Sequence, residues 1–168
     1  GGGGLGRRGG GGGWVVGVRL VKTDHIFMKR DFVTQDEIMT FLAAQAVTLG
    51  ISSDQAAVYR KLLTREEEST TGMMDGFAIP HAKDHSIEEA NVIIVQLNSK
   101  IDWKSLDGEG TDFIIALFIP DSEAGTTHLK LLSQVARLLM HKEVTNCLKQ
   151  AQSPDEIAEI LNGKLAEN

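Results

Sequence analysis

The sequence predicts an α/β fold in which a mixed, mostly buried β-sheet is sandwiched between helices. Two apolar runs rich in β-branched residues, 91–97 and 112–119, have the pattern of strands that are covered on both faces. Segments with apolar residues at helical spacing lie before and after these runs. Because strands and helices are interleaved along the chain, we expect the sheet to lie between helical layers.

The 168 residues are predicted to form one domain, 20–168, preceded by a flexible tail, 1–19. Ten of the first 13 residues are glycine, and the first 19 include no acidic residue. Such a segment buries too little apolar surface to offset the entropy lost on ordering. The sequence leaves open whether this tail is native or was introduced by cloning. Its glycine spacings resemble phosphate-binding fingerprints, but no predicted strand precedes them and no predicted helix follows.

The charge balance argues against nucleic acid as a partner. Residues 20–168 hold 14 of the 17 basic residues and all 23 acidic ones, a net charge of −9. Such a surface would attract a protein with a basic face, although an acidic surface that only maintains solubility is an equally good interpretation. The single cysteine, Cys147, excludes an internal disulfide, and no apolar run approaches the ~20 residues of a membrane helix. We therefore expect a cytoplasmic protein without direct membrane insertion.

The N-terminal part is predicted to contain a strand and a helix. The strand is expected within 25–32. Thr34 and Glu37 then have the spacing of a capping box, in which each residue binds the backbone N–H of the other. Apolar residues at helical spacing follow, and Gly50 is expected to end this helix.

A second helix is predicted from a cap at Ser52 or Ser53 to about Glu66. This helix places Arg65 near its C-terminal end, where a cation is favoured by the helix dipole.

The C-terminal half is predicted to alternate loops with strands and three further helices. Beside the two apolar strands, the expected elements are a loop over 83–90, a turn-rich connection over 101–108, a loop over 121–126, a long helix capped by Thr127, a short helix over 143–151, and a last helix capped by Ser153 and ended by Gly163.

A short apolar strand, 77–79, is followed by Pro80 and His81. Proline cannot donate to a sheet ladder, so the strand is expected to stop there and to leave His81 at an exposed strand end, outside the core. The small Ala82 would leave the imidazole open to a large partner. The segment 65–72, just upstream, is rich in charged and hydroxyl side chains.

The other histidines are weaker candidates for chemistry. His25 and His141 are interpreted as structural, the latter at a helix C-terminus. His81 and His85 have the spacing of half a zinc site, but the predicted loop and the lack of a third ligand argue against a metal. His128 lies on the apolar stripe of the long helix, so a buried structural role and a place beside His81 both remain open.

The residues around His81 suit the binding of an anion. Arginine and hydroxyl groups donate hydrogen bonds to phosphate oxygens, and an imidazole can attack phosphorus. Arg65 and His128 are the candidate companions. No serine or cysteine is placed as a nucleophile, and no acid pair suits sugar hydrolysis.

These motifs resemble the enzyme IIA domain of the phosphoenolpyruvate-dependent sugar phosphotransferase system, of the fructose–mannitol type. The resemblance extends over about residues 26–163, in order and without a large gap. It rests on Arg65-Glu66, on the stretches 69–72, 76–82, 101–103 and 106–108, and on His128-Leu129.

The resemblance implies a phosphotransferase that needs no cofactor or metal. In that family the residue matching His81 accepts a phosphoryl group from the phosphocarrier protein HPr and passes it to the cysteine of a sugar-specific IIB component. Arg65 and His128 match the residues that bind the phosphoryl oxygens. The ring nitrogen of His81 that does not attack is expected to donate to a carbonyl or another acceptor, which fixes the tautomer.

The resemblance leaves the biological role open. The chain would serve uptake of a fructose- or polyol-like sugar, peripheral to a IIC permease through its IIB partner. The alternative is a regulatory protein of the nitrogen-related branch, whose phosphorylation state is read by protein partners. An interaction domain with a vestigial site is a third and weaker alternative. The segment 73–75 is bulkier than the glycine-rich spacing expected before the strand, so the sugar is not assigned.

Overall fold

The computed structural model describes residues 20–123 and 126–166, with the backbone alone at 123 and 126–128. The predicted tail, 1–19, lies outside the described residues. Within the described part, five strands and five α-helices are present. In chain order the elements are η2 (Thr23–His25), β3 (Ile26–Arg30), α1 (Gln35–Thr48), α2 (Gln55–Glu68), β4 (Phe77–Ala78), β5 (His81–Asp84), β6 (Asn91–Ile101), β7 (Thr111–Pro120), η3 (Asp121–Glu123), α3 (Thr126–Leu138), α4 (Lys142–Gln150) and α5 (Pro154–Ala166).

The strands form one mixed sheet in the order β3-β6-β7-β4, with β5 also paired to β7. The long central strands β6 and β7 are antiparallel, and Ile94 lies opposite Ile115. The outer strands β3, β4 and β5 run parallel to their neighbours. The predicted mixed sheet is therefore confirmed.

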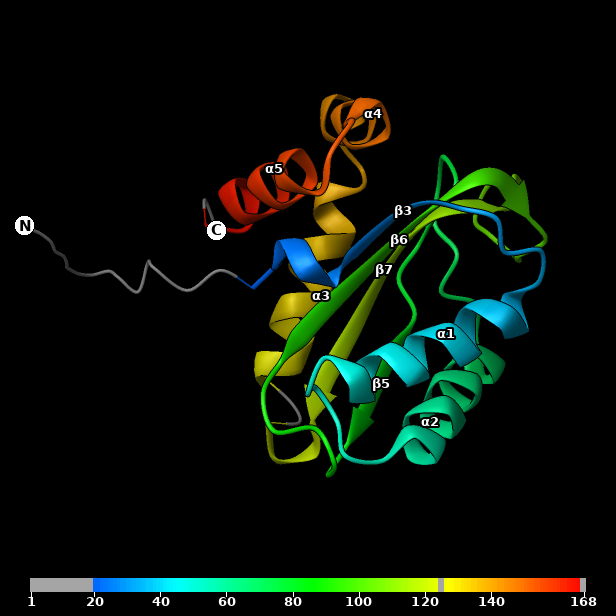
Figure 1. The fold of residues 1–168 in the computed structure, drawn as a ribbon. Coiled ribbons are helices and arrows are strands. Elements are labelled where there is room, and N and C mark those ends of the chain that lie inside the picture. The colour runs from blue at the N-terminus through cyan, green and yellow to red at the C-terminus, as the bar shows by residue number, and fades with distance from the viewer. Residues whose placement is uncertain (1–19, 124–125, 167–168) are drawn as a thin grey trace, which may run out of the picture.

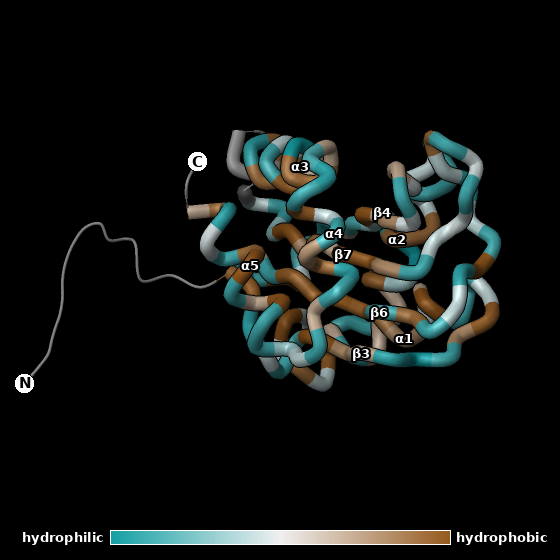
Figure 2. Tube along the Cα trace, turned by 90° about the horizontal axis from the view of Figure 1, so that it is seen from above, coloured by the Kyte–Doolittle hydropathy of each residue, from teal (hydrophilic) through white to brown (hydrophobic). Residues whose placement is uncertain are grey.

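Helices cover both faces of the sheet (Figure 1). Helices α1 and α2 lie over one face, where Ile93 and Ile114 are fully buried. Helices α3, α4 and α5 contribute to the cluster over the other face, with Val92 and Ile115. Figure 2 shows the hydrophobic colour following β6 and β7 between these layers. Because each fully buried aliphatic side chain contributes roughly 1.5–3 kcal/mol, the two central strands anchor both layers.

The start and end signals of the first helix are confirmed. The Thr34 hydroxyl accepts a hydrogen bond from the Glu37 N–H at 3.1 Å, and the Glu37 carboxylate accepts from the Thr34 N–H at the same distance. After α1, Gly50 adopts a φ of +77°, which glycine tolerates without a steric cost.

The predicted cap of the second helix is wrong. Asp54 is the N-cap of α2, because its carboxylate accepts from the Ala57 N–H at 3.0 Å. Ser53 is exposed, and the Ser52 hydroxyl lies 2.7 Å from the Ser86 hydroxyl. Ser52 therefore connects the loop before α2 to the loop after β5.

Three predictions in the C-terminal half are also corrected. Helix α3 begins at Thr126, so Thr127 lies inside it. Helix α5 continues past Gly163, because Leu165 beyond that glycine packs against the core. His141 is the N-cap residue of α4 and does not lie in a helix C-terminal turn. None of the helices in the described ranges has the length and apolar character needed to cross a membrane.

The edge of the sheet beside β7 is interrupted at Pro80. Strands β4 and β5 pair with successive stretches of β7, and the Pro80 carbonyl accepts from the Leu117 N–H at 3.0 Å. The missing proline N–H breaks the strand, but the chain resumes pairing at His81. The strand therefore extends to Asp84, into the stretch predicted as a loop.

Candidate active site

His81 lies at the start of an edge strand, but this strand end is buried and not exposed. It is the first residue of β5, opposite Leu117 of β7, and only 6% of its surface is exposed. The sequence-based expectation of an exposed imidazole is therefore wrong. The cause is the resumed pairing after Pro80, which the missing N–H of proline does not prevent.

The imidazole of His81 is held at both ring nitrogens. Its Nδ1 lies 3.0 Å from the Ile79 carbonyl oxygen, which can only accept a hydrogen bond. The Arg65 Nε–H, which can only donate, lies 2.9 Å from Nε2. Together these contacts require the neutral tautomer with its proton on Nδ1. The predicted carbonyl partner is present, and Nε2 carries the lone pair.

Arg65 is positioned by the end of its own helix. It lies in the last turn of α2, and its Nη1 donates to the Ser69 carbonyl at 2.8 Å and to the Ser69 hydroxyl at 3.4 Å. The carbonyl groups at a helix C-terminus lack helical partners, so this contact also satisfies one of them. The structure therefore brings Arg65 and His81 together as predicted.

A hollow of about 330 Å³ opens beside this pair. Its lining residues are Lys61, Thr64, Arg65, Glu68, His81 and Lys83. Three of them are cations and one is an acid, although residues 20–168 as a whole are acidic. Such a local excess of positive charge favours an anion at Nε2.

Asp84, at the end of β5, is a buried acid next to this hollow. Burial opposes its charged form, but hydrogen bonds from Ser86 and the nearby His85 and Lys61 outweigh this effect and hold the pKa of the Asp84 carboxyl below its usual value. The Lys61 Nζ lies 4.0 Å from the carboxylate. Asp84 is therefore ionised at neutral pH and helps to place Lys61 at the hollow.

The other predicted candidates are less well defined. His128 belongs to the first turn of α3, and its side chain lies outside the described residues, so its contact with His81 stays a prediction. The His85 side chain is 86% exposed and lies beside Asp84 at 3.9 Å. Among the described residues, no three His, Cys, Asp or Glu side chains are grouped to hold a metal ion.

Glu66 lies beside this site, and the sequence analysis included it in the family motif without assigning it a role. Its carboxylate accepts from the Thr70 hydroxyl at 3.0 Å, the Thr71 N–H at 2.9 Å, the Thr71 hydroxyl at 2.5 Å and the Trp103 indole N–H at 3.1 Å. One signal was available: an acid at a helix end followed within five residues by two threonines.

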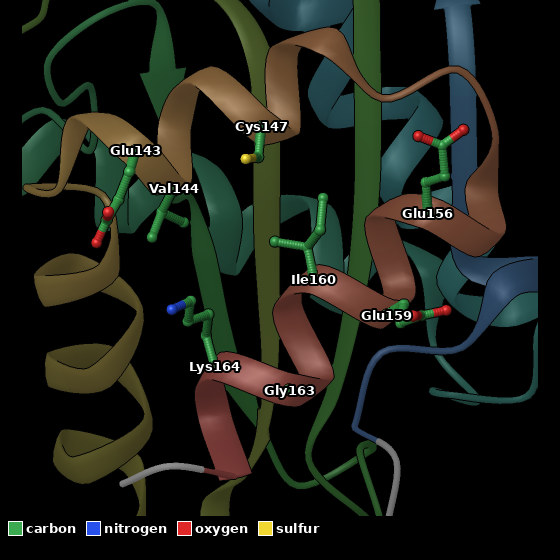
Figure 3. A pocket seen from close by; sticks show the side chains of 8 residues that line it. All are labelled: Glu143, Val144, Cys147, Glu156, Glu159, Ile160, Gly163 and Lys164. Atoms are coloured by element: carbon green, nitrogen blue, oxygen red, sulfur yellow. The ribbon is translucent and has the colours of Figure 1, made fainter.

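A second and larger hollow lies between α4 and α5 (Figure 3). Its volume is about 510 Å³, and the side chains of Cys147 and Ile160 point toward it from the two helices. Glu143, Glu156 and Glu159 also line it. This groove involves none of the residues that surround His81.

Comparison with known proteins shows the family to which the chain belongs. The family model described as "Phosphoenolpyruvate-dependent sugar phosphotransferase system, EIIA 2" matches residues 19–164. A fructose-specific EIIA component of Haloferax volcanii is 32% identical over 128 residues, which cover 76% of this chain and 82% of that protein. A nitrogen regulatory protein of Bradyrhizobium diazoefficiens is 35% identical over 142 residues, which cover 84% and 92%.

Solved structures share the fold. The nitrogen regulatory protein IIA-Ntr from Neisseria meningitidis superposes with a TM-score of 0.79 at 23% identity, covering 84% of this chain and 96% of that one. The Escherichia coli mannitol IIA, solved in complex with phosphorylated IIB, gives a TM-score of 0.71 at 21% identity, with the same coverage.

Several relatives are much longer than this chain. It spans 22% of the Escherichia coli EIIABC component specific for 2-O-alpha-mannosyl-D-glycerate, at 30% identity, and 19% of the Bacillus subtilis fructose-specific EIIABC component, at 34%. The alignments with the long relatives and with the short ones each cover most of this chain. The chain belongs to the EIIA 2 family of the phosphoenolpyruvate-dependent sugar phosphotransferase system.

Proposed function

We propose that this protein is a histidine phosphocarrier that accepts a phosphoryl group from phosphorylated HPr on Nε2 of His81. The observation that carries this proposal is the contact of Arg65 with Nε2, combined with the proton on Nδ1. This arrangement presents an unprotonated ring nitrogen beside a guanidinium, which is what attack on a phosphoryl group requires.

The first transfer exchanges one P–N bond for another. The lone pair of Nε2 attacks phosphorus, and the bond from phosphorus to the HPr imidazole breaks with its electron pair returning to HPr. Such transfers pass through a loose transition state, so the protein contributes mainly alignment and charge stabilisation. The Arg65 Nε–H, which binds Nε2 in the resting state, moves to a phosphoryl oxygen, and the Ile79 carbonyl retains the Nδ1 proton.

The second transfer passes the group to the cysteine of a IIB component. The thiolate attacks phosphorus, and the P–N bond breaks with its electron pair returning to Nε2. His128, at the start of α3, is proposed as a second donor to the phosphoryl oxygens. The solved mannitol IIA was captured with phosphorylated IIB, and the shared fold supports a partner of this kind.

A regulatory role is the second candidate function. Two relatives named nitrogen regulatory protein are 35% and 38% identical to this chain, slightly more than the fructose-specific relatives at 32% and 34%. Phosphorylation of His81 is common to both roles. Transfer onward to a purified fructose-type IIB would support the transport role, and retention of the phosphoryl group in its presence would support the regulatory one.

The central test is the His81→Ala variant. Incubation with phosphoenolpyruvate, enzyme I and HPr should add one phosphoryl mass to the wild-type protein, measured by intact-mass spectrometry, and none to the variant. His85→Ala is the matched control, because His85 is a highly exposed histidine four residues downstream. Because His81 is buried, thermal unfolding of the variant must be measured alongside. Phosphorylation of a folded His81→Ala protein would refute the assignment.

A further inference from the structure

We infer that Glu66 is a positioning residue that sets both groups of the phosphoryl site, Arg65 and His81, through one loop. The inference rests on the phosphocarrier function proposed above. Glu66 lies in the last turn of α2, next to Arg65, and is half-buried. Its carboxylate turns to the loop 69–72 and to Trp103.

The carboxylate joins the end of α2 to the loop 69–72 that follows it and to Trp103, which is distant in sequence. Oε2 accepts from the Thr70 hydroxyl, the Thr71 N–H and the Trp103 indole, and Oε1 accepts from the Thr71 hydroxyl. Trp103 is 37 residues away along the chain. A carboxylate offers only acceptors, with two lone pairs on each oxygen, so it suits a site where several donors converge.

The loop held by Glu66 carries the anchor of Arg65. The Ser69 carbonyl, which accepts from the Arg65 Nη1 at 2.8 Å, directly precedes Thr70 and Thr71. Displacement of these threonines would therefore move the carbonyl that orients the guanidinium. Arg65 would then lose the geometry that points its Nε–H at Nε2.

The same loop supports the imidazole from the other side. The Thr71 carbonyl accepts from the Ile79 N–H at 3.0 Å, and the Ile79 carbonyl accepts the Nδ1 proton of His81. A continuous path therefore leads from Glu66 through Thr71 and Ile79 to the histidine. The tautomer of His81 depends on the last contact of this path.

The loop 69–72 is packed closely against the segment that carries Trp103. A Cβ at Gly72 would lie 2.1 Å from the Lys104 carbonyl oxygen, and the Thr70 hydroxyl, whose one proton can serve either acceptor, lies within hydrogen-bond distance of that oxygen as well as of Glu66. The loop is thus pressed against the segment that carries Trp103. Glu66 lies where α2, this loop and that segment meet.

The test compares Glu66→Ala with Glu66→Gln and with the exposed neighbour variant Glu67→Ala. Alanine removes all four acceptor contacts. The two lone pairs of a glutamine carbonyl can accept from the Thr71 N–H and the Trp103 indole, and the Thr70 proton can go to the Lys104 carbonyl. The glutamine amide can donate to the Thr71 hydroxyl, so this variant should rescue. The rate of phosphorylation by phosphorylated HPr is measured by rapid quench. We expect kcat of the Ala variant to fall more than tenfold, with KM within twofold of wild type. We expect kcat of the Gln variant to stay within threefold of wild type, and Glu67→Ala to match wild type.

A second readout needs no phosphotransfer. In ¹⁵N spectra, the His81 ring of the wild type and the Gln variant should show one protonated and one unprotonated nitrogen. In the Ala variant the two shifts should approach each other as the tautomers mix. If wild type is not phosphorylated, the proposed function fails, and this measurement still tests Glu66. Unchanged ring shifts, unchanged transfer in Glu66→Ala, or a Gln variant as slow as Ala would overturn the inference.

Single-donor variants cover the case in which Glu66→Ala does not fold. Thr71→Val and Trp103→Phe each remove a side-chain donor to Glu66. Of these two residues, only Thr71 also contacts Ile79, through its backbone carbonyl. Loss of the Thr71 hydroxyl should loosen this residue, so its variant should shift the ¹⁵N signals of the His81 ring and slow transfer more than the Trp103 variant. If the two variants changed the ring signals and the transfer rate equally, or not at all, the proposed path from Glu66 to His81 would be refuted.

Discussion

Two hollows of this protein, the one beside His81 and the groove between α4 and α5, differ in how their polar groups are held. The hollow beside His81 is the smaller, about 330 Å³ against about 510 Å³ for the groove between α4 and α5. In the smaller one, Arg65 and His81 contact each other and are fixed by backbone carbonyls. The larger one is bordered by carboxylates on two neighbouring helices and by an exposed thiol. Mutual orientation of polar groups, and not volume, therefore distinguishes the candidate active site.

The difference follows from the elements that form each hollow. The His81 hollow lies where a helix ends and an edge strand is interrupted, so backbone groups that lack regular partners are available to orient side chains. The α4–α5 groove lies between the sides of two complete helices, whose backbone groups are already paired. Variants at each hollow should therefore affect different properties.

Among the variants that compare these two hollows, Arg65→Lys should have the largest effect. Lysine has one ammonium group and cannot bind Nε2 and the Ser69 carbonyl with separate nitrogens in a planar fork. We expect phosphorylation of His81 to slow by more than tenfold, about 1.4 kcal/mol or more of transition-state stabilisation, with the fold retained. Rapid-quench kinetics with phosphorylated HPr measure the rate.

The control for this variant is Lys149→Arg, a cation replacement at the remote ion pair with Asp112. It should leave the transfer rate unchanged. A rate within twofold of wild type for Arg65→Lys would show that the guanidinium contributes only to the end of α2.

Part of the fold and of the candidate site could be predicted from the sequence. The capping box at Thr34, the strands other than β5 and the pairing of Arg65 with His81 were predicted, because each depends on local pattern or on the family motif. The burial of His81 was not, because it depends on β5 resuming its pairing with β7 after Pro80. The role of Glu66 was also missed, since one of its donors, Trp103, is 37 residues away. Contacts of that range leave little local signal.

His128→Gln should have an intermediate effect. If His128 is a donor to the phosphoryl oxygens, its replacement should slow transfer to the IIB cysteine about fivefold, the equivalent of one hydrogen bond of about 1 kcal/mol. Glutamine is similar in size, so the melting temperature should change little. Thermal unfolding and single-turnover transfer on the same protein decide between the two roles. A large fall in melting temperature with unaltered transfer would make His128 a structural residue.

Cys147→Ser should have the smallest effect on transfer, and it tests the larger hollow directly. Cys147 is exposed on α4 and is the single cysteine of the chain, so a thiol reagent reports on this groove alone. We expect the transfer rate to match wild type and the free energy of unfolding to change by less than about 0.5 kcal/mol.

Val144→Ala tests whether a loss of stability at the same groove affects phosphotransfer. Val144 lines this groove, but it is only 3% exposed. The substitution should cost on the order of 2 kcal/mol of unfolding free energy, because it removes methyl groups from the core cluster under α4, and it should still leave transfer intact. Complete alkylation of Cys147 should likewise leave phosphorylation of His81 unchanged. A loss of transfer on alkylation that the serine variant prevents would place function in the groove. The distinction drawn between these two hollows would then fail.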